Sequence, residues 1–286
     1  MLIVSKLNGQ LGNKLFHFSY FIANAIEHEH KLVYPGFSEY KEYFEKTALN
    51  DFGRYNVTQK ILPGGIFNKR LSILLQYHKI KYYKFAYHSL QDEDYQNIDF
   101  DLNNINFQEL IKNKILIADG WQYRDRDNLV KHKETIRSIF TPQKKYLDKV
   151  EKLITDLRQA ADVVIGVHIR RGDYASFNNG KYFYPVEVYT EKMKEIKSLF
   201  EQQGKTCAFL ICSNESFNKD IFNNMKVNIE ERHFITDIYA LSKCDYIIGP
   251  PSTFSLWASF YGSVPLMMIE TPDMKVELDK FSIANN

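Results

Sequence analysis

The sequence predicts an α/β protein of two domains, each with a parallel sheet. Apolar strands alternate with amphipathic helices through the second half of the chain, which is typical of a doubly wound sheet with right-handed crossovers. A strand–helix–strand pattern opens the chain, and 286 residues are enough for two cores of ordinary size. We expect the first domain to span residues 1–155 and the second to span residues 156–286.

The N-terminal pattern starts with a short apolar strand at residues 2–4, which is followed by a long helix with one broad apolar face. The turn between them holds Gly9 and Gly12, which allow the backbone to approach a ligand at the helix N-terminus. Their G-x-x-G spacing matches neither the dinucleotide fingerprint nor the P-loop. A tight turn without a ligand is therefore the alternative interpretation.

The middle of the chain contains an unusual basic and aromatic stretch. Residues 60–88 carry six Lys or Arg and no acid, interleaved with tyrosines. One interpretation is a surface that contacts an anionic membrane or a sugar acceptor. The simpler interpretation is a set of helices with solvated lysines and buried aromatic rings. Farther along, residues 115–118 predict a strand that ends in Asp119, and helices are expected at residues 134–140 and 144–160. We expect the last of these helices to bridge the two domains.

The second half of the chain contains short, regular elements. Strands are expected at residues 163–168, 207–212, 233–235, 246–249 and 265–269, with helices at 186–203, from 216, at 237–244 and at 253–261.

The first of these strands belongs to the stretch VVIGVHIRRGDY, residues 163–174, in which an apolar run ends abruptly in charge. Ligands of open α/β sheets bind beyond the carboxyl ends of the strands, so His168, Arg170 and Arg171 form a candidate site. Because the arginine fork holds phosphate oxygens in pairs, the cluster indicates a phosphorylated ligand. A surface ion pair between Arg171 and Asp173 is the alternative.

Two later helix starts add to this site. Ser252 or Thr253 begins a helix after a strand and a Gly-Pro-Pro turn, where free N–H groups and the helix dipole favour an anion. This helix start and Arg170 both follow strand ends, which allows them to converge on one pyrophosphate. Asp237 is either the N-cap of its helix or a carboxylate that accepts hydrogen bonds from N1–H and the N2 amino group of guanine.

Composition and motifs exclude several classes of function. A net charge of +2 is too balanced to indicate a nucleic-acid partner. The sequence has no His or Cys spacing typical of zinc and no G-x-S-x-G elbow. Asp-x-Asp triplets of the kind that hold Mg²⁺ or Mn²⁺ lie at residues 92–94, 99–101 and 125–127, but their polar surroundings favour solvated acids. We therefore expect no metal site.

Features that bear on the compartment point to the cytoplasm. Cys207, Cys212 and Cys244 lie in apolar segments, and their odd number predicts reduced thiols. The N-terminus lacks the basic region and cleavage site of a signal peptide, and no apolar run reaches the roughly 20 residues of a membrane span. We expect a cytoplasmic protein, with peripheral contact to the inner membrane through residues 60–88 as one option.

Four blocks of the sequence resemble the α-1,2-fucosyltransferase family, within the superfamily that also holds the α-1,6 enzymes. The segment HIRRGDY at 168–174 is similar to the family's H-x-R-R-x-D signature, and GQLGNKLF at 9–16 is similar to its G-G-L-G-N-Q-M-F block. Trp121-Gln122 resembles its W-Q block, and STFSLW at 252–257 resembles S-T-F-S-W-W. The blocks keep the family's order. The departures at Gln10, Lys14 and Leu256 bear on the acceptor linkage and the sugar rather than on the donor nucleotide.

This resemblance implies a GT-B-like fold with two Rossmann-like domains and a deep cleft between them. It further implies an inverting transferase that moves L-fucose from GDP-L-fucose to a glycan without a metal. Arg170 would hold the β-phosphate, His168 would line the guanosine site and Asp237 would hold guanine. The remaining implied contacts are Ser252 and Thr253 to phosphate, Gly9, Gly12 and Asn13 over the diphosphate, and His17, Trp121 and Gln122 on the acceptor side.

The resemblance leaves the general base and the acceptor open. Asp173 is the first candidate for the base, followed by His17 and Glu215, although Asp173 would serve equally to orient an arginine. The expected acceptor is an oligosaccharide or lipid-linked glycan of a surface polysaccharide, with α-1,2 linkage to a terminal galactose. A transferase for another GDP-sugar, and a catalytically silent glycan- or nucleotide-binding protein, are the alternatives.

Overall fold

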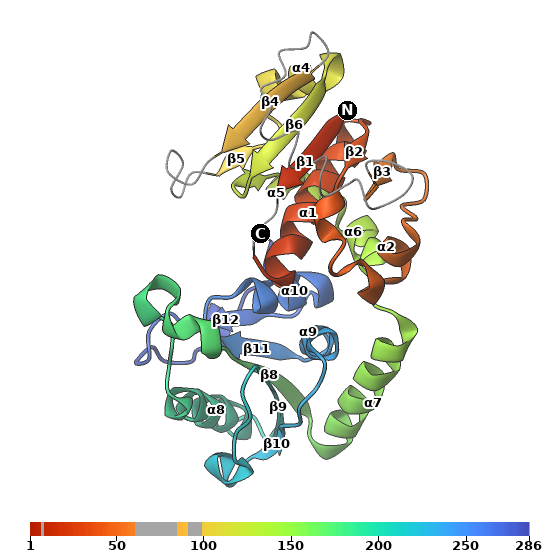
Figure 1. The fold of residues 1–286 in the computed structure, drawn as a ribbon. Coiled ribbons are helices and arrows are strands. Elements are labelled where there is room, and N and C mark those ends of the chain that lie inside the picture. The colour runs from red at the N-terminus through yellow and green to blue at the C-terminus, as the bar shows by residue number, and fades with distance from the viewer. Residues whose placement is uncertain (7–8, 61–84, 91–98, 286) are drawn as a thin grey trace. The chain divides into compact units, whose positions relative to one another are not determined.

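The computed structural model describes residues 1–6, 9–60, 85–90 and 99–285, which form two compact units, Met1–Gln143 and Lys144–Asn286 (Figure 1). The boundary lies ahead of the expected position at residue 155 because helix α7 (Lys144–Ala160) belongs entirely to the second unit. Its apolar side is buried, and its Tyr146 ring lies 4.8 Å from the ring of His233. This helix packs against α9 (Phe234–Leu241) and is part of the second unit's core rather than a bridge.

The first unit contains a five-stranded parallel sheet with the strand order β3-β2-β1-β6-β4. The chain leaves β1 toward β2 and β3 on one side, and β6 and β4 lie on the other side. The strand order therefore reverses between β1 and β6, which is where open α/β sheets bind ligands. The strands are β1 (Leu2–Lys6), β2 (Leu32–Val33), β3 (Val57–Thr58), β4 (Phe85–Leu90) and β6 (Ile115–Gly120).

Helix α1 (Leu11–Glu27) forms the aromatic core of this unit. Its Phe18 ring stacks on Tyr34 with 4.0 Å between centroids, and Phe37 and Phe140 pack against the same ring. The other elements are the short pair β5 (Phe100–Asp101) and β7 (Tyr123–Arg124), the 3₁₀ turns Pro35–Phe37 and Lys41–Tyr43, and helices α2 (Glu45–Leu49), α4 (Ile105–Asn113), α5 (Arg126–Lys131) and α6 (Lys133–Ile139).

Asp125 corrects the expectation that all three Asp-x-Asp triplets are solvated. Its side chain is buried and caps α5 by accepting from the Asn128 amide at 3.2 Å. It also accepts from the side-chain amides of Asn24 at 2.8 Å and Asn103 at 2.9 Å. A carboxylate with this many donors is a structural group. Asp99 pairs with Arg124 and Arg126, and the triplet at 92–94 lies outside the described residues.

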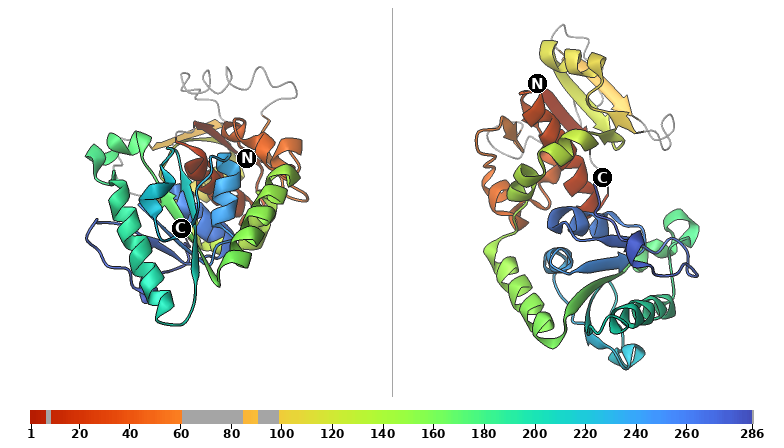
Figure 2. Two further views of the ribbon diagram at one scale, coloured as in Figure 1. Left: turned by 90° about the horizontal axis from the view of Figure 1, so that it is seen from below. Right: turned by 180° about the vertical axis from the view of Figure 1, so that it is seen from behind.

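The second unit contains a parallel sheet with the order β10-β9-β8-β11-β12, and its order reverses between β8 and β11. Alternate residues of β8 pack beneath α8 on one face of the sheet, while α9 covers the other face so closely that a Cβ at Gly166 would meet Leu241 at 2.5 Å (Figure 2). The elements are β8 (Val163–Ile169), α8 (Val186–Glu201), β9 (Cys207–Ser213), β10 (Lys226–Asn228), β11 (Tyr246–Gly249), α10 (Thr253–Gly262) and β12 (Leu266–Met268), with 3₁₀ turns at Gly172–Ala175, Phe177–Gly180, Lys219–Phe222 and Leu278–Lys280.

The strand expected at residues 233–235 is wrong. The third strand of this sheet is β10, and Phe234 already begins α9. The reason is that β10 is a three-residue edge strand with one exposed and two partly buried side chains, so it has no apolar run to signal it. The apolar residues Phe234 and Ile235 instead open a helix that packs on α7.

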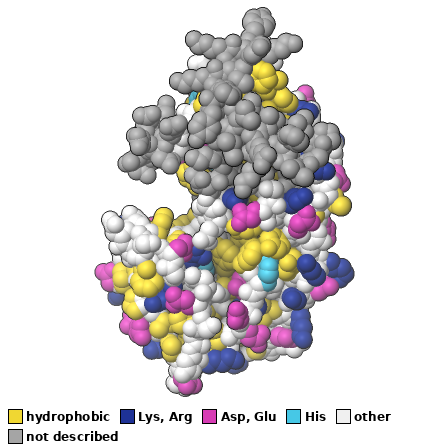
Figure 3. Space-filling view, in the orientation of Figure 1, with side chains coloured by type: hydrophobic (Ala, Val, Ile, Leu, Met, Phe, Trp, Pro, Cys, Tyr) yellow, Lys and Arg dark blue, Asp and Glu magenta, His cyan; other side chains and the backbone are white. Residues whose placement is uncertain are grey.

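The distribution of surface charge and the state of the thiols agree with the sequence. Figure 3 shows acidic and basic side chains interspersed over the second unit, consistent with the small net charge. Cys207, Cys212 and Cys244 are free and buried. Among the helices in the described part of the chain, none has the length and hydropathy needed to cross a bilayer. Most of the basic stretch 60–88 lies outside the described residues.

Replacing Asp125 by Ala should lower the free energy of unfolding by about 3 kcal/mol, because several buried amide donors then lose their acceptor. Urea unfolding of the purified chain measures this loss. Replacing its exposed neighbour Asp127 by Ala provides the control and should change stability by less than about 0.5 kcal/mol. Equal losses in the two variants would contradict the structural role of Asp125.

Candidate active site

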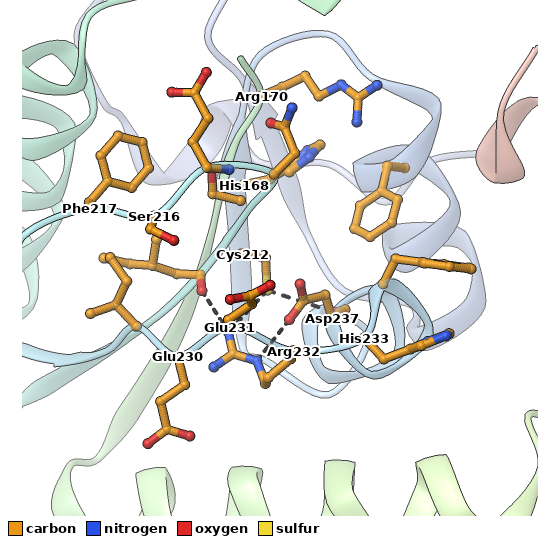
Figure 4. Close-up of a pocket in the computed structure, with 17 residues that line it drawn as sticks. His168, Arg170, Cys212, Ser216, Phe217, Glu230, Glu231, Arg232, His233 and Asp237 are labelled. Atoms are coloured by element: carbon orange, nitrogen blue, oxygen red, sulfur yellow. Dashed lines mark hydrogen bonds and ion pairs between the residues drawn. The ribbon is translucent and has the colours of Figure 1, made fainter. Parts of the chain in front are cut away.

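A cavity of about 350 Å³ opens at the carboxyl edge of the second sheet (Figure 4). Its walls come from the ends of β8 and β9, the segment before α9, and the first turn of α10, so it lies at the reversal of strand order. In Figure 4, Arg170 lies above, the pair Arg232 and Asp237 lies below, and His168 lies between them. The sequence-predicted residues His168, Arg170, Glu215 and Asp237 all line this one cavity.

His168 is the penultimate residue of β8 and is only 4% exposed. Its Nδ1 shares a 2.7 Å hydrogen bond with the Ser255 hydroxyl, and its ring lies 4.9 Å from the ring of Phe254. Burial, assisted by the nearby Arg170 charge, lowers the pKa of His168 to about 3. The imidazole is therefore neutral at working pH and contributes hydrogen bonds rather than charge.

Arg170 supplies positive charge to the cavity. Its guanidinium donates to Asp173 Oδ2 at 2.7 Å and lies 5.5 Å from the ring centroid of Tyr174. The Tyr174 hydroxyl donates in turn to the Pro251 carbonyl at 2.6 Å. These contacts link the turn after β8 to the turn after β11. Asp173 thus orients Arg170 in this structure, which is the second of the two roles considered for it.

Arg171 makes a separate set of contacts. Its Nε donates to Glu215 Oε2 at 2.7 Å, and its Nη1 donates to the Tyr184 carbonyl at 2.9 Å. Its backbone N–H donates to Asn214 Oδ1 at 3.0 Å. The expected Arg171–Asp173 surface pair is therefore replaced by Arg170–Asp173 and Arg171–Glu215. Glu215 holds the turn that carries Arg170, and its role as a candidate base stays a prediction.

Asp237 lies in the first turn of α9, but it is not the N-cap. His233 is the N-cap and accepts from the Ile235 amide at 3.2 Å. The Asp237 carboxylate is 7% exposed and accepts from Arg232 Nε at 2.8 Å. Burial raises the pKa of Asp237 to about 6, and the Arg232 charge opposes this rise. Asp237 is thus an ionised carboxylate at neutral pH with a titration range close to neutrality.

Arg232 is the site residue that the sequence analysis missed. It also donates to Asn228 Oδ1 at 2.6 Å and to the Ile211 carbonyl at 2.7 Å, so one guanidinium joins β9, β10 and α9. In the sequence it follows Glu230 and Glu231 and resembles a solvated loop residue. Only its position five residues before Asp237 could have suggested the pair.

Ser252 and Thr253 lie beside the cavity but do not line it. Ser252 is the N-cap of α10 and accepts from the Phe254 amide at 3.3 Å, as the capping interpretation predicts. The following residue, Phe254, contributes to the cavity wall. The phosphate role of Ser252 and Thr253 therefore stays a prediction.

The remaining predicted residues belong to the first unit. Gly9 has φ of +89° in the turn between β1 and α1, and a Cβ there would meet the Asn13 side chain at 2.4 Å. Gly12 lies in the first turn of α1. This geometry agrees with a turn that requires glycine.

His17 does not fit either an acceptor contact or a general base. It is fully buried, with Nδ1 within 2.6 Å of the Tyr34 hydroxyl and Nε2 3.2 Å from the Gly120 carbonyl. Burial, with the charge of Arg124, lowers its pKa to about 3. It instead stacks beneath Trp121 with 5.7 Å between centroids. Trp121 is half-buried and Gln122 is buried.

A family model described as glycosyl transferase family 11 matches residues 4–280. The chain belongs to glycosyl transferase family 11. It is 24% identical to an α-1,2-colitosyltransferase of Escherichia coli, over 95% of this chain and 91% of the relative. It is 22% identical to the O-antigen biosynthesis glycosyltransferase WbnK of Escherichia coli, over 94% of this chain and 93% of the relative.

Solved structures share the fold of this family 11 glycosyltransferase. A mutant of Arabidopsis thaliana FUT1 in complex with GDP has a TM-score of 0.60 at 13% identity, over 98% of this chain and 72% of that one. The fucosyltransferase NodZ from Bradyrhizobium has a TM-score of 0.59 at 15% identity, over 96% of each chain. The expected GT-B class of two parallel α/β units is confirmed.

The described residues of this family 11 chain contain no group of three or more His, Cys, Asp or Glu side chains placed to hold a metal ion. Cys212 lies in the cavity wall, but burial raises the pKa of its thiol well above the ordinary value. The thiol is therefore protonated and is not a nucleophile. The charged groups available to a ligand in the cavity are those of Arg170, Arg232, Asp237 and the acids near them.

Replacing Arg232 by Gln should lower the free energy of unfolding by about 3 kcal/mol at pH 7.5, because Asp237 becomes a buried, unpaired carboxylate. The loss should shrink at pH 5. The folded-state pKa of Asp237, already above the unfolded value of about 3.9, rises further in the variant, so the folded protein takes up a proton that removes the penalty.

Urea unfolding at the two pH values measures both quantities. The control is Arg158→Gln, which removes a more exposed pair with Asp245. Its effect should be small and equal at pH 5 and pH 7.5. A pH-independent loss in the Arg232 variant would contradict the account of this ion pair.

Proposed function

We propose that this glycosyltransferase moves L-fucose from GDP-fucose to a hydroxyl of an acceptor glycan, with inversion at the anomeric carbon and α-1,2 linkage to a terminal galactose. The observation that carries the proposal is the cavity that brings His168 and Arg170, at the end of β8, together with Asp237 of α9. The Arg170 cation matches the diphosphate, the neutral His168 imidazole matches the guanosine, and the Asp237 carboxylate matches the guanine base. The family membership and the shared GT-B fold support the same donor class.

The proposed donor contacts follow from the chemistry of each group. Asp237 accepts hydrogen bonds from guanine N1–H and N2, which present two donors to one carboxylate. His168 hydrogen-bonds the guanosine as a neutral group. Arg170 holds the β-phosphate oxygens. The N-terminus of α10 at Ser252 and Thr253 adds partial positive charge, and Gly9, Gly12 and Asn13 supply polar groups of the first unit to the diphosphate.

The reaction step itself is electrostatic. As the C1–O bond to the β-phosphate breaks, positive charge develops on the sugar ring and negative charge on the departing GDP. Arg170 is already oriented by Asp173 and Tyr174, so it stabilises the leaving group without reorganising. The proposed enzyme uses this guanidinium in place of a metal ion.

A second donor has specific support. The relative named an α-1,2-colitosyltransferase is 24% identical over nearly the whole chain, so GDP-colitose is the strongest rival among GDP-sugars. A catalytically silent nucleotide- or glycan-binding protein is the rival from another class. It would bind GDP without releasing it from a donor.

The acceptor and the compartment extend the proposal. The relative named for O-antigen biosynthesis supports a surface-polysaccharide glycan, oligosaccharide or lipid-linked, as the acceptor. Assembly from a GDP-sugar and the three buried free thiols fit a cytoplasmic location. Peripheral contact with the inner membrane through residues 60–88 stays a prediction.

The deciding experiment incubates the chain with GDP-fucose, GDP-colitose or GDP-mannose and a panel of β-galactosides in EDTA. Released GDP and the linkage of the product are both read out. The proposal expects transfer from GDP-fucose, with an α-1,2 product. Transfer only from another GDP-sugar would replace the donor, and GDP binding without turnover of any donor would favour the silent protein.

Replacing Arg170 by Ala should reduce the transfer rate by about 10²–10³, since one preorganised donor to the leaving group is lost. Initial rates of GDP release measure the effect, and the melting temperature checks the fold. Lys197→Ala on α8 is the control, because that side chain pairs with Glu201 away from the cavity. Retention of more than about a tenth of the activity in the Arg170 variant would remove it from the chemistry.

The affinity for GDP-fucose should fall below pH 6. Guanine donates to the ionised carboxylate of Asp237, whose pKa is raised to about 6, so protonation at lower pH removes the acceptor. The dissociation constant should rise about tenfold per pH unit in this range. Calorimetric titration with GDP-fucose isolates the effect, because a diphosphate diester has no phosphate group that titrates there. A flat profile between pH 5 and 7.5 would contradict the role of Asp237.

A further inference from the structure

The first unit has its own reversal of strand order, between β1 and β6, and an acid lies at this point. Asp119 is the penultimate residue of β6 and is in register with Lys6 of β1 and Ser89 of β4. The turn with Gly9 follows β1 at the same edge of the sheet, because the strands are parallel. A carboxylate at a switch point occupies the position where α/β sheets place functional groups.

Only one oxygen of the Asp119 carboxylate has a hydrogen-bond partner among the described residues. Its Oδ2 accepts from the Tyr87 hydroxyl at 3.0 Å. Its Oδ1 is buried and has no hydrogen-bond partner among the described residues. A buried carboxylate oxygen without a donor is costly, and such groups in native structures call for a functional explanation. A hydroxyl of a bound molecule is a donor that would satisfy it.

The residues next to Asp119 form a surface suited to a sugar. Gly120 has φ of +140°, and a Cβ there would meet the Leu90 carbonyl at 2.6 Å, so the chain turns sharply after the carboxylate. Trp121 follows, and its ring lies 5.7 Å from the His17 ring and 5.0 Å from the Arg124 guanidinium. The accessible part of this half-buried indole offers an apolar surface and a polar N–H to a sugar ring.

The other candidates for a proton acceptor are occupied. Asp173 is ion-paired with Arg170, and Glu215 is ion-paired with Arg171. His17 has both ring nitrogens within hydrogen-bond distance of Tyr34 and Gly120. Asp119 differs from these three in having a buried oxygen with no hydrogen-bond partner among the described residues.

We propose that Asp119 is the general base of the transfer reaction and that Trp121 supports the acceptor sugar beside it. This inference rests on the proposed function. The acceptor hydroxyl oxygen forms the new bond to C1 of the donor sugar with its lone pair. The C1–O bond to the β-phosphate breaks, and GDP leaves with that electron pair. The hydroxyl proton passes to the Asp119 carboxylate and then to solvent.

Replacing Asp119 by Asn, which keeps the shape but cannot take the proton, should lower kcat for transfer by about 10²–10³. The KM for the donor and the affinity for GDP should change less than twofold, because Asp119 is not among the residues proposed to contact the donor nucleotide. Asp119→Ala should be similarly slow, and added formate should restore its rate at least fivefold by acting as the missing base. A purely structural role would show no rescue.

Asp127→Asn is the matched control, since it removes the same charge from an exposed position of the same unit. It should leave kcat, KM and GDP affinity unchanged. Melting temperatures of all variants check the fold, and formate rescue of the Ala variant keeps the test valid if the Asn variant is unstable.

The experiment distinguishes a failure of the proposed function from a failure of the Asp119 assignment. If the unmodified chain transfers no sugar from any GDP-sugar, the proposed function fails and this inference fails with it. If the unmodified chain is active and Asp119→Asn retains more than about a third of kcat, or formate does not rescue Asp119→Ala, only the assignment of Asp119 is overturned.

Discussion

The parallel pairing of β8 with β9 on one side and β11 on the other is the constraint on which the candidate site depends. All seven residues of β8 are buried, so the strand cannot slip without exposing apolar side chains or burying charged ones. Its register places His168 opposite Cys212 of β9, and Val167 opposite Ile248 of β11. Three strand ends therefore meet at one edge, where the charged residues that follow β8 and β9 lie near the start of α10 that follows β11.

Buried charge at this edge is tolerated because it is paired across elements. Arg232 contacts β9, β10 and α9 at once, and its Nε holds the carboxylate of Asp237. In the first unit, Asp125 is likewise paired, because amide donors surround its carboxylate. Both arrangements satisfy their carboxylates. Asp119 stands apart from them, since one of its oxygens is buried with no partner in the described part of the chain.

Much of this organisation is readable in the sequence because it follows from burial. Apolar runs ending in polar residues located β8, β9 and β11, and the strand ends led directly to His168 and Arg170. The failures have a common physical origin in short or polar segments. The edge strand β10 has no apolar run, and Arg232 sits in a charged loop whose partner is recognisable only after folding.

Side-chain environment was the least predictable property. His17, placed on the acceptor side by resemblance, is fully buried between Tyr34 and Gly120. Asp125, expected in solvent, is a buried helix cap. Asp119, predicted only as the end of a strand, has a buried oxygen with no hydrogen-bond partner among the described residues. Burial of a polar residue depends on contacts from distant segments, such as Asn24 with Asp125 or Tyr87 with Asp119, and no local pattern encodes them.

The central claim is that the cavity beside β8 reads a guanine base through Asp237. The most direct test is to titrate the chain and its Asp237→Asn variant with GDP and with xanthosine diphosphate in EDTA. The carboxylate accepts from the guanine N2 amino group, whereas the amide of Asn can donate to the carbonyl that xanthine carries at that position. The account predicts that the unmodified chain prefers GDP and that the variant prefers xanthosine diphosphate. Equal affinity of both proteins for GDP, or no affinity in either, would contradict it.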